Sequence, residues 1–319
     1  MKKLTILACW LLALLLTSFP ARAQEQPETF VFTPQWTAQA QFAGYYVALE
    51  KGFYAEEGLQ VVIEHASVSQ IAENRIQEGK SDAATMQLAQ AVGMVDQGVD
   101  VVNILQTSMN NGLVIISRAE DGASRLSNGS KIATWRAGFD QIPLCMTSEQ
   151  HLEYEWVQSA GAVNLFVAGA VDAMLGMSYN EYYQVIQTGL LNADAAVFRF
   201  KDHGYNIQED GVYMMRSVYE KDPDRALRFA RASRRGWTYA AEHPEEALKI
   251  VMTYVRRNRV ATNAVLQKLM LDEVLRLQLD PDTGERSFTL RRDMTEAVSR
   301  MLYVNGMISR EIQYEDLLP

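Results

Sequence analysis

Cysteine and histidine are scarce in this chain of 319 residues. It has two cysteines, Cys9 and Cys145, and four histidines. The histidines show no spacing such as HxxxH and have no neighbouring cysteine, so no zinc site is indicated. The G-x-S-x-G, P-loop and G-x-G-x-x-G motifs are missing as well. We therefore expect a protein that is not an enzyme and that uses no cofactor and no metal.

Long hydrophobic runs are absent after the first 23 residues. The start of the chain combines two lysines, an apolar run from Leu4 to Phe19 and the small-x-small sequence Ala21-Arg22-Ala23, which is the pattern of a secretory signal peptide. Cys9 lies too early within the apolar run for a lipoprotein site. No later stretch is long and apolar enough to span a membrane. We expect removal of residues 1–23 and, if the source is a Gram-negative bacterium, a periplasmic protein with Cys145 as a buried thiol.

Positive charge is also low. The 30 Lys and Arg residues face 39 Asp and Glu residues, and loss of the signal removes three basic residues and no acid, which takes the formal net charge from −9 to −12. Such a protein repels nucleic acid and anionic membranes. Four arginines recur at a spacing of three residues. They could form a stripe that binds nucleic acid or the solvated face of a helix, and the acidic net charge of the chain favours the solvated face. The series is Arg225, Arg228, Arg231 and Arg234.

Short apolar segments alternate with helical ones in the first part of the mature chain. This βαβα pattern predicts a parallel sheet covered by helices. The expected strands are 30–32, 59–63, 83–86 and 101–105, and the expected helices are 40–51, 69–79 and 88–97.

A second α/β unit follows, and residues from Pro223 onward are nearly all helical. The expected strands are 113–117, 131–135, 164–167 and 197–200, with 171–177 a strand or turn, and the expected helices are 148–159 and 181–188. Residues 213–216 are expected to form a strand that returns to the first unit. We predict two α/β lobes, the first made of 24–112 and 216–319 and the second of 113–215. Two strands, near 112–116 and 211–215, would form a hinge between them, and such a hinge allows a cleft to close over a ligand.

The loop and helix of residues 33–58 contain one candidate site. They follow an apolar strand, and open α/β sheets bind ligands at the carboxyl ends of their strands. Trp36 and the pair Tyr45 and Tyr46 would flank a cleft there. The alternative is that these aromatic residues belong to the core.

A second candidate is the segment from Met177 to Tyr183, which includes Tyr179, Asn180 and Glu181. Apolar walls with a few polar groups are typical of small-molecule pockets. A carboxylate there could accept hydrogen bonds from an amino group on a planar heterocycle while aromatic rings stack on it. The alternative is that Asn180 and Glu181 cap the helix that follows. Residues 106–111 and 135–139 are further possible rims, where Gly138 allows close approach of the backbone.

Several segments resemble one protein family. They are QAQFAGYYVALEKGFYAEEGL (39–59), QEGKSD (77–82), KIATWRAG (131–138), GAVDAMLGMSYNE (169–181) and RASRRGWTYAAEHPEEA (231–247). In this order they are similar to segments of the NMT1/THI5-like, or SsuA/THI5-like, periplasmic solute-binding proteins of ABC transporters. The resemblance implies a type II periplasmic-binding-protein fold and delivery of a small ligand, of the kind represented by thiamine-precursor pyrimidines, to an inner-membrane permease.

The resemblance also implies roles for individual residues. Trp36 and Tyr45 or Tyr46 would stack on the ring, and Glu181 with Asn180 would contact the amino-pyrimidine edge. The residues expected to complete the wall are Gln41, Met86, Trp135 and Gly138. The segment 65–69, HASVS, lacks the glycines that cradle an anion in many relatives, which disfavours a phosphate or sulfonate group. The alternatives are a sulfonate or other small solute, a binding lobe for a membrane sensor, and a pyrimidine-forming enzyme, which the lack of a cysteine cluster disfavours; we expect a monomer.

Overall fold

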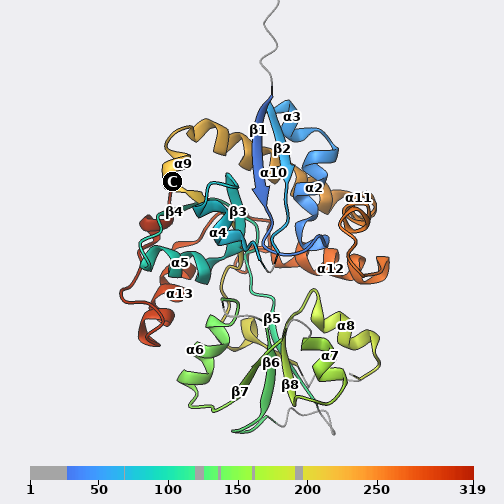
Figure 1. Cartoon of the computed structure of the whole chain (residues 1–319), viewed down its shortest axis with the longest axis vertical. Coiled ribbons are helices and arrows are strands. Elements are labelled where there is room, and N and C mark those ends of the chain that lie inside the picture. The colour runs from blue at the N-terminus through green and yellow to red at the C-terminus, as the bar shows by residue number, and fades with distance from the viewer. Residues whose placement is uncertain (1–26, 68, 119–125, 136–137, 160–161, 191–196) are drawn as a thin grey trace, which may run out of the picture.

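The computed structural model describes residues 27–67, 69–118, 126–135, 138–159, 162–190 and 197–319. The predicted signal peptide, residues 1–23, lies outside the described residues and stays a prediction. The described chain forms two lobes stacked along the long axis of the molecule, each built on a five-stranded sheet (Figure 1). The two predicted α/β lobes are therefore present.

The first sheet has the strand order β2-β1-β3-β10-β4. Its strands are β1 (Glu28–Thr33), β2 (Leu59–Ile63), β3 (Ala83–Gln87), β4 (Val101–Gln106) and β10 (Asp210–Met215). β1 is parallel to β2 and β3, as the βαβα pattern predicts, whereas β10 is antiparallel to β3 and β4. The parallel strands place their carboxyl ends at one edge of the sheet, facing the second lobe (Figure 1).

Helices surround this sheet. They are η1 (Ala40–Phe42), α2 (Ala43–Glu50), α3 (Phe53–Glu56), α4 (Ala72–Gln77), α5 (Leu88–Asp96), α9 (Arg216–Tyr219), α10 (Pro223–Glu242), α11 (Pro244–Arg257), α12 (Ala264–Leu277), α13 (Arg292–Val304) and η4 (Tyr314–Leu317). The long helix α10 begins at Pro223, where the Asp222 side chain accepts a hydrogen bond from the main-chain N–H of Arg225 at 3.0 Å. None of the described helices combines the length and apolar character of a membrane span.

Two glycines allow α10 to pack closely on α2. A Cβ atom at Gly236 would lie 2.1 Å from the carbonyl oxygen of Gly44, and a Cβ atom at Gly44 would lie 2.2 Å from the ring of Trp237. Neither position can accept a side chain without a backbone shift. This contact fixes α2, and with it the loop that joins β1 to α2.

The arginines of α10 form ion pairs within the first lobe. Arg225 pairs with Glu28 and Asp82, and Arg231 pairs with Glu57 at 2.8 Å. The prediction of a solvated helix face is right for Arg231, whose side chain is 52% exposed, but the Arg225 side chain is only 16% exposed. The series therefore fastens α10 to neighbouring strands and loops of the same lobe.

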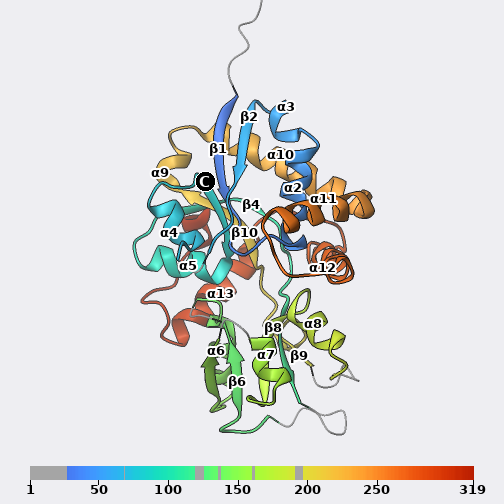
Figure 2. The same cartoon turned by 45° about the vertical axis from the view of Figure 1, so that its right-hand side comes forward.

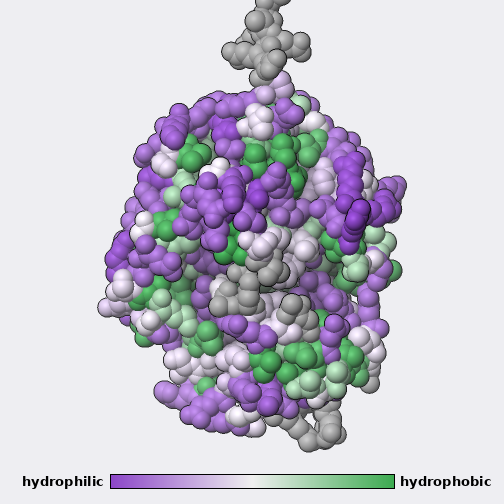
Figure 3. Space-filling view, viewed as in Figure 1, coloured by the Kyte–Doolittle hydropathy of each residue, from purple (hydrophilic) through white to green (hydrophobic). Residues whose placement is uncertain are grey.

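The second sheet has the strand order β7-β6-β8-β5-β9. Its strands are β5 (Leu113–Ser117), β6 (Lys131–Thr134), β7 (Glu155–Gln158), β8 (Ala173–Met177) and β9 (Val197–Arg199), and its helices are α6 (Gln141–Glu149), α7 (Ala162–Val167), α8 (Glu181–Gln187) and η3 (Phe200–His203). β6 is parallel to β7 and β8, whereas β5 is antiparallel to β8 and β9. Figure 3 shows mostly hydrophilic residues over the first lobe and an apolar area on the second.

Two predictions for the second lobe are wrong. The expected helix 148–159 is instead the end of α6, a turn and the strand β7, and His151 in that turn has a φ of 52°, which ends the helix. The expected strand 164–167 is the helix α7, in which Ala162 and Phe166, one helical turn apart, are both buried. Short apolar runs fit either period, and burial against the rest of the lobe decides between them.

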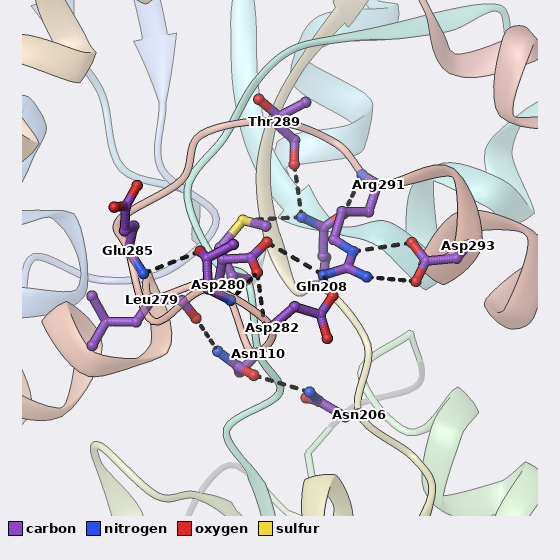
Figure 4. A network of polar contacts seen from close by, with 12 residues as sticks. Asn110, Asn206, Gln208, Leu279, Asp280, Asp282, Glu285, Thr289, Arg291 and Asp293 are labelled. Carbon is purple, nitrogen blue, oxygen red and sulfur yellow. Dashed lines mark hydrogen bonds and ion pairs between the residues drawn. The ribbon is translucent and has the colours of Figure 1, made fainter.

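The chain passes between the sheets in two segments, 107–112 and 204–209, seen from a second side in Figure 2. The second crossing precedes the expected joint at 211–215, because those residues pair with β3 and β4 inside the first sheet. Asn206 Nδ2 donates a hydrogen bond to Asn110 Oδ1 at 2.9 Å and so ties the two segments together (Figure 4). Asn110 Nδ2 in turn donates to the carbonyl oxygen of Leu279 at 2.6 Å. The C-terminal region of the first lobe thereby braces the crossing.

Candidate ligand-binding cleft

A small cavity lies between the lobes, at the carboxyl ends of β1, β3, β6 and β8. The first lobe lines it with Gln35, Trp36, Gln39, Gln41 and Gln87, and the second lobe with Trp135, Phe139, Met177, Tyr179, Asn180 and Glu181. A wider opening of about 390 Å³ adjoins it and is bordered by Trp36, Glu181 and residues 260–263.

Aromatic rings from both lobes meet at this cavity. The ring centroids of Trp36 and Phe139 are 5.8 Å apart with an angle of 84° between the ring planes, an edge-to-face contact across the two lobes. Phe139 also contacts Trp135 edge-on, with centroids 6.4 Å apart. Tyr179 is 4% exposed and lines the inner side. The walls therefore offer several ring faces and edges to a flat ligand.

Glu181 is the one carboxylate among the described residues that line this cavity. It begins α8 and is 7% exposed. Glu181 Oε2 accepts a hydrogen bond from the main-chain N–H of Met177 at 2.9 Å, and Asn180 Nδ2 donates to Oε1 at 3.2 Å. Burial raises the pKa of Glu181, and these hydrogen bonds lower it in part. The Asn180 side chain makes no capping bond to the helix backbone, so the simple cap interpretation does not describe it.

Two glutamines of the first lobe bond to Asp210, at the start of β10, and a third bonds to one of these two. Gln35 Nε2 donates to Asp210 Oδ1 and Gln41 Nε2 donates to Oδ2, both at 2.6 Å. Gln39 Nε2 donates to Gln41 Oε1, also at 2.6 Å. Because an ionised carboxylate only accepts hydrogen bonds, Asp210 determines which end of each bonded amide faces it.

Two neighbouring acids lie beside the crossing segments, the buried Glu209 and the half-buried Asp210. Burial raises the pKa of Glu209 to about 8, with a further increase from the adjacent Asp210. Burial also raises the pKa of Asp210 to about 6, although the bonds from Gln41 and Gln35 oppose this. Glu209 Oε2 accepts a hydrogen bond from the main-chain N–H of Gly112 at 2.9 Å, which links the two crossings. Among the described residues no three His, Cys, Asp or Glu side chains are grouped to hold a metal ion.

The structure brings together Trp36, Gln41, Trp135, Tyr179, Asn180 and Glu181 of the predicted site. Four other predicted residues, Tyr45, Tyr46, Met86 and Gly138, do not line the cavity. Tyr45 packs on Phe32 and Trp237, and Tyr46 stacks on Tyr254 with centroids 4.2 Å apart. The core alternative therefore describes the positions of both tyrosines, because the inner face of α2 turns toward α10 and α11.

Met86 and Gly138 are close to the cavity without facing it. Met86 is fully buried within β3. Gly138 has a φ of 107°, and its N–H donates to Asp140 Oδ1 at 3.2 Å, so it forms the turn that presents Phe139. Gly138 therefore shapes the turn and is not itself part of the cavity lining.

Five lining residues were not singled out individually: Gln35, Gln39, Gln87, Phe139 and Met177, although the last two lie in the candidate segments 135–139 and 177–183. The signal for most of them was present, because Gln35 and Gln39 flank Trp36, Phe139 ends the WRAGF segment and Met177 begins the MSYNE segment. Gln87 is the last residue of β3, and its position at the carboxyl end of a strand was the available indication.

Residues 39–247 match the family described as NMT1/THI5 like. The chain belongs to this family. A formylaminopyrimidine-binding protein of Halalkalibacterium halodurans is 25% identical over 274 residues, which are 79% of each chain. A riboflavin-binding protein, RibY, of Chloroflexus aurantiacus is 22% identical over 285 residues, covering 81% of this chain and 76% of that one. The predicted resemblance is confirmed.

The fold is also found among solved structures. The periplasmic aliphatic sulphonate binding protein SsuA of Escherichia coli superposes with a TM-score of 0.65 at 13% identity, covering 92% of this chain and 97% of that one. At this identity the match concerns the fold alone. The predicted periplasmic-binding-protein fold is confirmed, and such a fold is that of solute-binding proteins.

Proposed function

We propose that this chain binds a small planar nitrogen heterocycle outside the cytoplasm and delivers it to the permease of an ABC importer. The observation that carries the proposal is that Trp36 and Glu181, which come from different lobes, line the same cavity. An indole ring supplies a stacking face, and a buried carboxylate supplies hydrogen-bond acceptors for an amino group on the edge of the ligand. Both lobes must close for the ligand to make both contacts.

A thiamine-precursor pyrimidine is the ligand that we favour. The relative that binds a formylaminopyrimidine aligns over most of both chains. An aminopyrimidine has the flat ring and the amino edge that Trp36 and Glu181 can serve. We further propose that the mature chain begins after residue 23, acts as a monomer and is not an enzyme.

Riboflavin is the second candidate. The RibY relative binds riboflavin, and the wider opening of about 390 Å³ beside the inner cavity can admit a larger ligand. A flavin would use the same aromatic walls. A sulfonate is less suited to a cavity where a carboxylate is among the lining groups, because like charges repel.

A thermal-shift screen of the mature chain tests these assignments. The probes are aminopyrimidines that carry a hydroxymethyl or a formylaminomethyl group, together with thiamine, riboflavin and taurine. Ligand at a hundred times its dissociation constant stabilises the folded protein by about 2.7 kcal/mol. Stabilisation by a pyrimidine with calorimetric binding of one molecule per chain is expected, whereas stabilisation by taurine alone would overturn the proposal.

A further inference from the structure

Two buried amide atoms at the first-lobe side of the cavity have no hydrogen-bond partner among the described residues. They are Gln35 Oε1, an acceptor, and Gln87 Nε2, a donor. Both residues line the cavity and are at least nine-tenths buried, with exposed fractions of 5% and 3%. Buried polar groups in folded proteins are almost always paired, because an unpaired one costs free energy. These two atoms therefore mark where a bound molecule supplies the missing partners.

The orientation of the Gln35 amide follows from its neighbours. Its Nε2 atom donates to Asp210 Oδ1 at 2.6 Å, so its Oε1 atom points away from that carboxylate. The Gln35 main-chain N–H donates to Thr85 Oγ1 at 2.8 Å, which holds the backbone of the residue against β3. Gln35 thus presents an acceptor and not a donor for as long as Asp210 is ionised.

Gln87 lies next to the same carboxylate. In the antiparallel pairing of β3 with β10, Gln87 is directly opposite Asp210. Its main-chain N–H donates to Gln90 Oε1 at 2.9 Å, at the start of α5, so its backbone is fixed while its side-chain Nε2 atom remains unpaired. The free acceptor of Gln35 and the free donor of Gln87 therefore belong to one cavity wall, on residues that bond to Asp210 or pair with it across the strands.

We propose that Gln35 and Gln87 bind a neutral amide-like group of the ligand, in which an N–H lies beside a C=O, with Asp210 as the positioning residue. The ligand N–H donates to Gln35 Oε1, and its carbonyl oxygen accepts from Gln87 Nε2. This inference rests on the proposed function and adds a second recognised edge, which lies on the first lobe, to the one that Glu181 contacts from the second lobe. A formylamino group provides such an N–H and C=O, whereas a hydroxymethyl group provides a single oxygen.

Calorimetry with two matched ligands tests the pair. The probes are the aminopyrimidines that carry a formylaminomethyl or a hydroxymethyl group, and the variants are Gln35→Met and Gln87→Met, with Gln97→Met on the exposed end of α5 as the control. Each cavity variant is expected to bind the formylaminomethyl ligand about ten-fold more weakly, a typical cost of one lost hydrogen bond. The affinity of each cavity variant for the hydroxymethyl ligand should change less. The control variant should keep the wild-type affinity for both ligands.

The outcomes separate the two claims. If the wild type binds neither pyrimidine, nor riboflavin with its imide edge, the proposed function fails and this inference fails with it. If the wild type binds a pyrimidine but the ratio of the two affinities is the same in Gln35→Met, Gln87→Met and the control, only the amide pair is overturned. Retained binding of the hydroxymethyl ligand shows that a variant is folded.

Asp210→Asn tests the positioning role. An asparagine at this site can donate through its own amide, so the Gln35 amide can turn and lose its acceptor orientation. The preference for the formylaminomethyl ligand is then expected to fall about as far as in Gln35→Met, and the double variant should lose little more. A purely structural role would weaken both ligands equally, and that result, or a full additive loss in the double variant, would overturn the assignment.

Discussion

The two lobes contribute different chemistry to the same cavity. The first lobe contributes the ring of Trp36 and several neutral amides, two of which bond to Asp210. The second lobe contributes aromatic and thioether side chains and the carboxylate of Glu181. The second lobe also contributes the amide of Asn180, but the ring of Trp36 and the carboxylate of Glu181 lie on opposite walls. A ligand that is recognised at both edges must therefore draw the lobes together, which is what a binding protein with a hinge requires.

Both apolar and polar side chains make direct contacts between the lobes: Trp36 meets Phe139 edge-on, and Cys145 of α6 contacts Met301 and Met307. Ser178 Oγ on the second lobe donates to Glu273 Oε1 on α12 at 3.0 Å, and Asn305 Nδ2, just after α13, donates to Glu149 Oε1 at 3.1 Å. Such partly exposed bonds each contribute only about 0.5–1.5 kcal/mol.

The largest expected effect comes from the second lobe. Glu181→Gln removes the charged acceptor, and we expect a loss of about 1.5–3 kcal/mol in the binding free energy of an aminopyrimidine, since hydrogen bonds to charged groups fall in this range. Isothermal titration calorimetry measures it, with the exposed Glu153→Gln as a control. An unchanged dissociation constant would contradict the role of Glu181.

The next effect tests the first lobe. Trp36→Ala removes one ring face, and we expect a cost of about 1–3 kcal/mol in binding, by analogy with stacking of bases on aromatic side chains. Tyr46→Phe is the matched control, because Tyr46 packs on Tyr254 away from the cavity and its hydroxyl is 2.9 Å from His65 Nε2. If the tyrosine variant loses as much affinity as the tryptophan variant, the assignment of the two aromatic residues is wrong.

The buried acids of the first lobe predict a dependence of stability on pH. The pKa of Glu209 is raised from 4.5 to about 8, so between these values the folded protein binds more protons than the unfolded chain, and the free energy of unfolding falls as the pH rises. Asp210 and Tyr179 are the titratable groups that face Glu209. Glu209→Gln should therefore be more stable than the wild type by more than about 1 kcal/mol at pH 8, and the gain should vanish near pH 4.

Denaturant unfolding at both pH values measures this difference. Glu285→Gln, on an exposed loop of the same lobe, is the control. A gain in the Glu209 variant that is equally large at pH 4 and pH 8 would show that titration of this carboxyl is not its cause.

The smallest expected effect concerns the contact between the lobes. Ser178→Ala removes the bond to Glu273, and we expect affinity to fall by about two- to ten-fold, because one partly exposed bond of the closed state is lost. Glu273 keeps its ion pair with Arg276, so the variant leaves no unpaired acid. A larger loss than in Trp36→Ala would mean that the lobes, and not the ligand, dominate closure.

The sequence predicted the architecture better than the details of the site. Alternating apolar and helical segments identified the strands of the first lobe, and the segments around Trp36 and Glu181 identified much of the cavity lining. Tyr45 and Tyr46 were assigned to the cleft because helical spacing places them on α2, but spacing alone does not say which face of a helix meets α10 and α11. The segment of β7 was predicted as part of a helix, and the segment of α7 was predicted as a strand. Both elements are only four to six residues long, and a run of that length fits the period of a helix and that of a strand.

The order of apolar runs, glycines and helix caps along the chain was enough to determine two α/β lobes with a ligand site at their strand ends, because these are local preferences of neighbouring residues. Only the tertiary structure decided that Asp210, some 175 residues after Gln35, orients that amide toward the cavity. It also decided that Gln87 lies opposite the same carboxylate. These pairings depend on how β10 returns between β3 and β4, and no local pattern specifies such a long-range register.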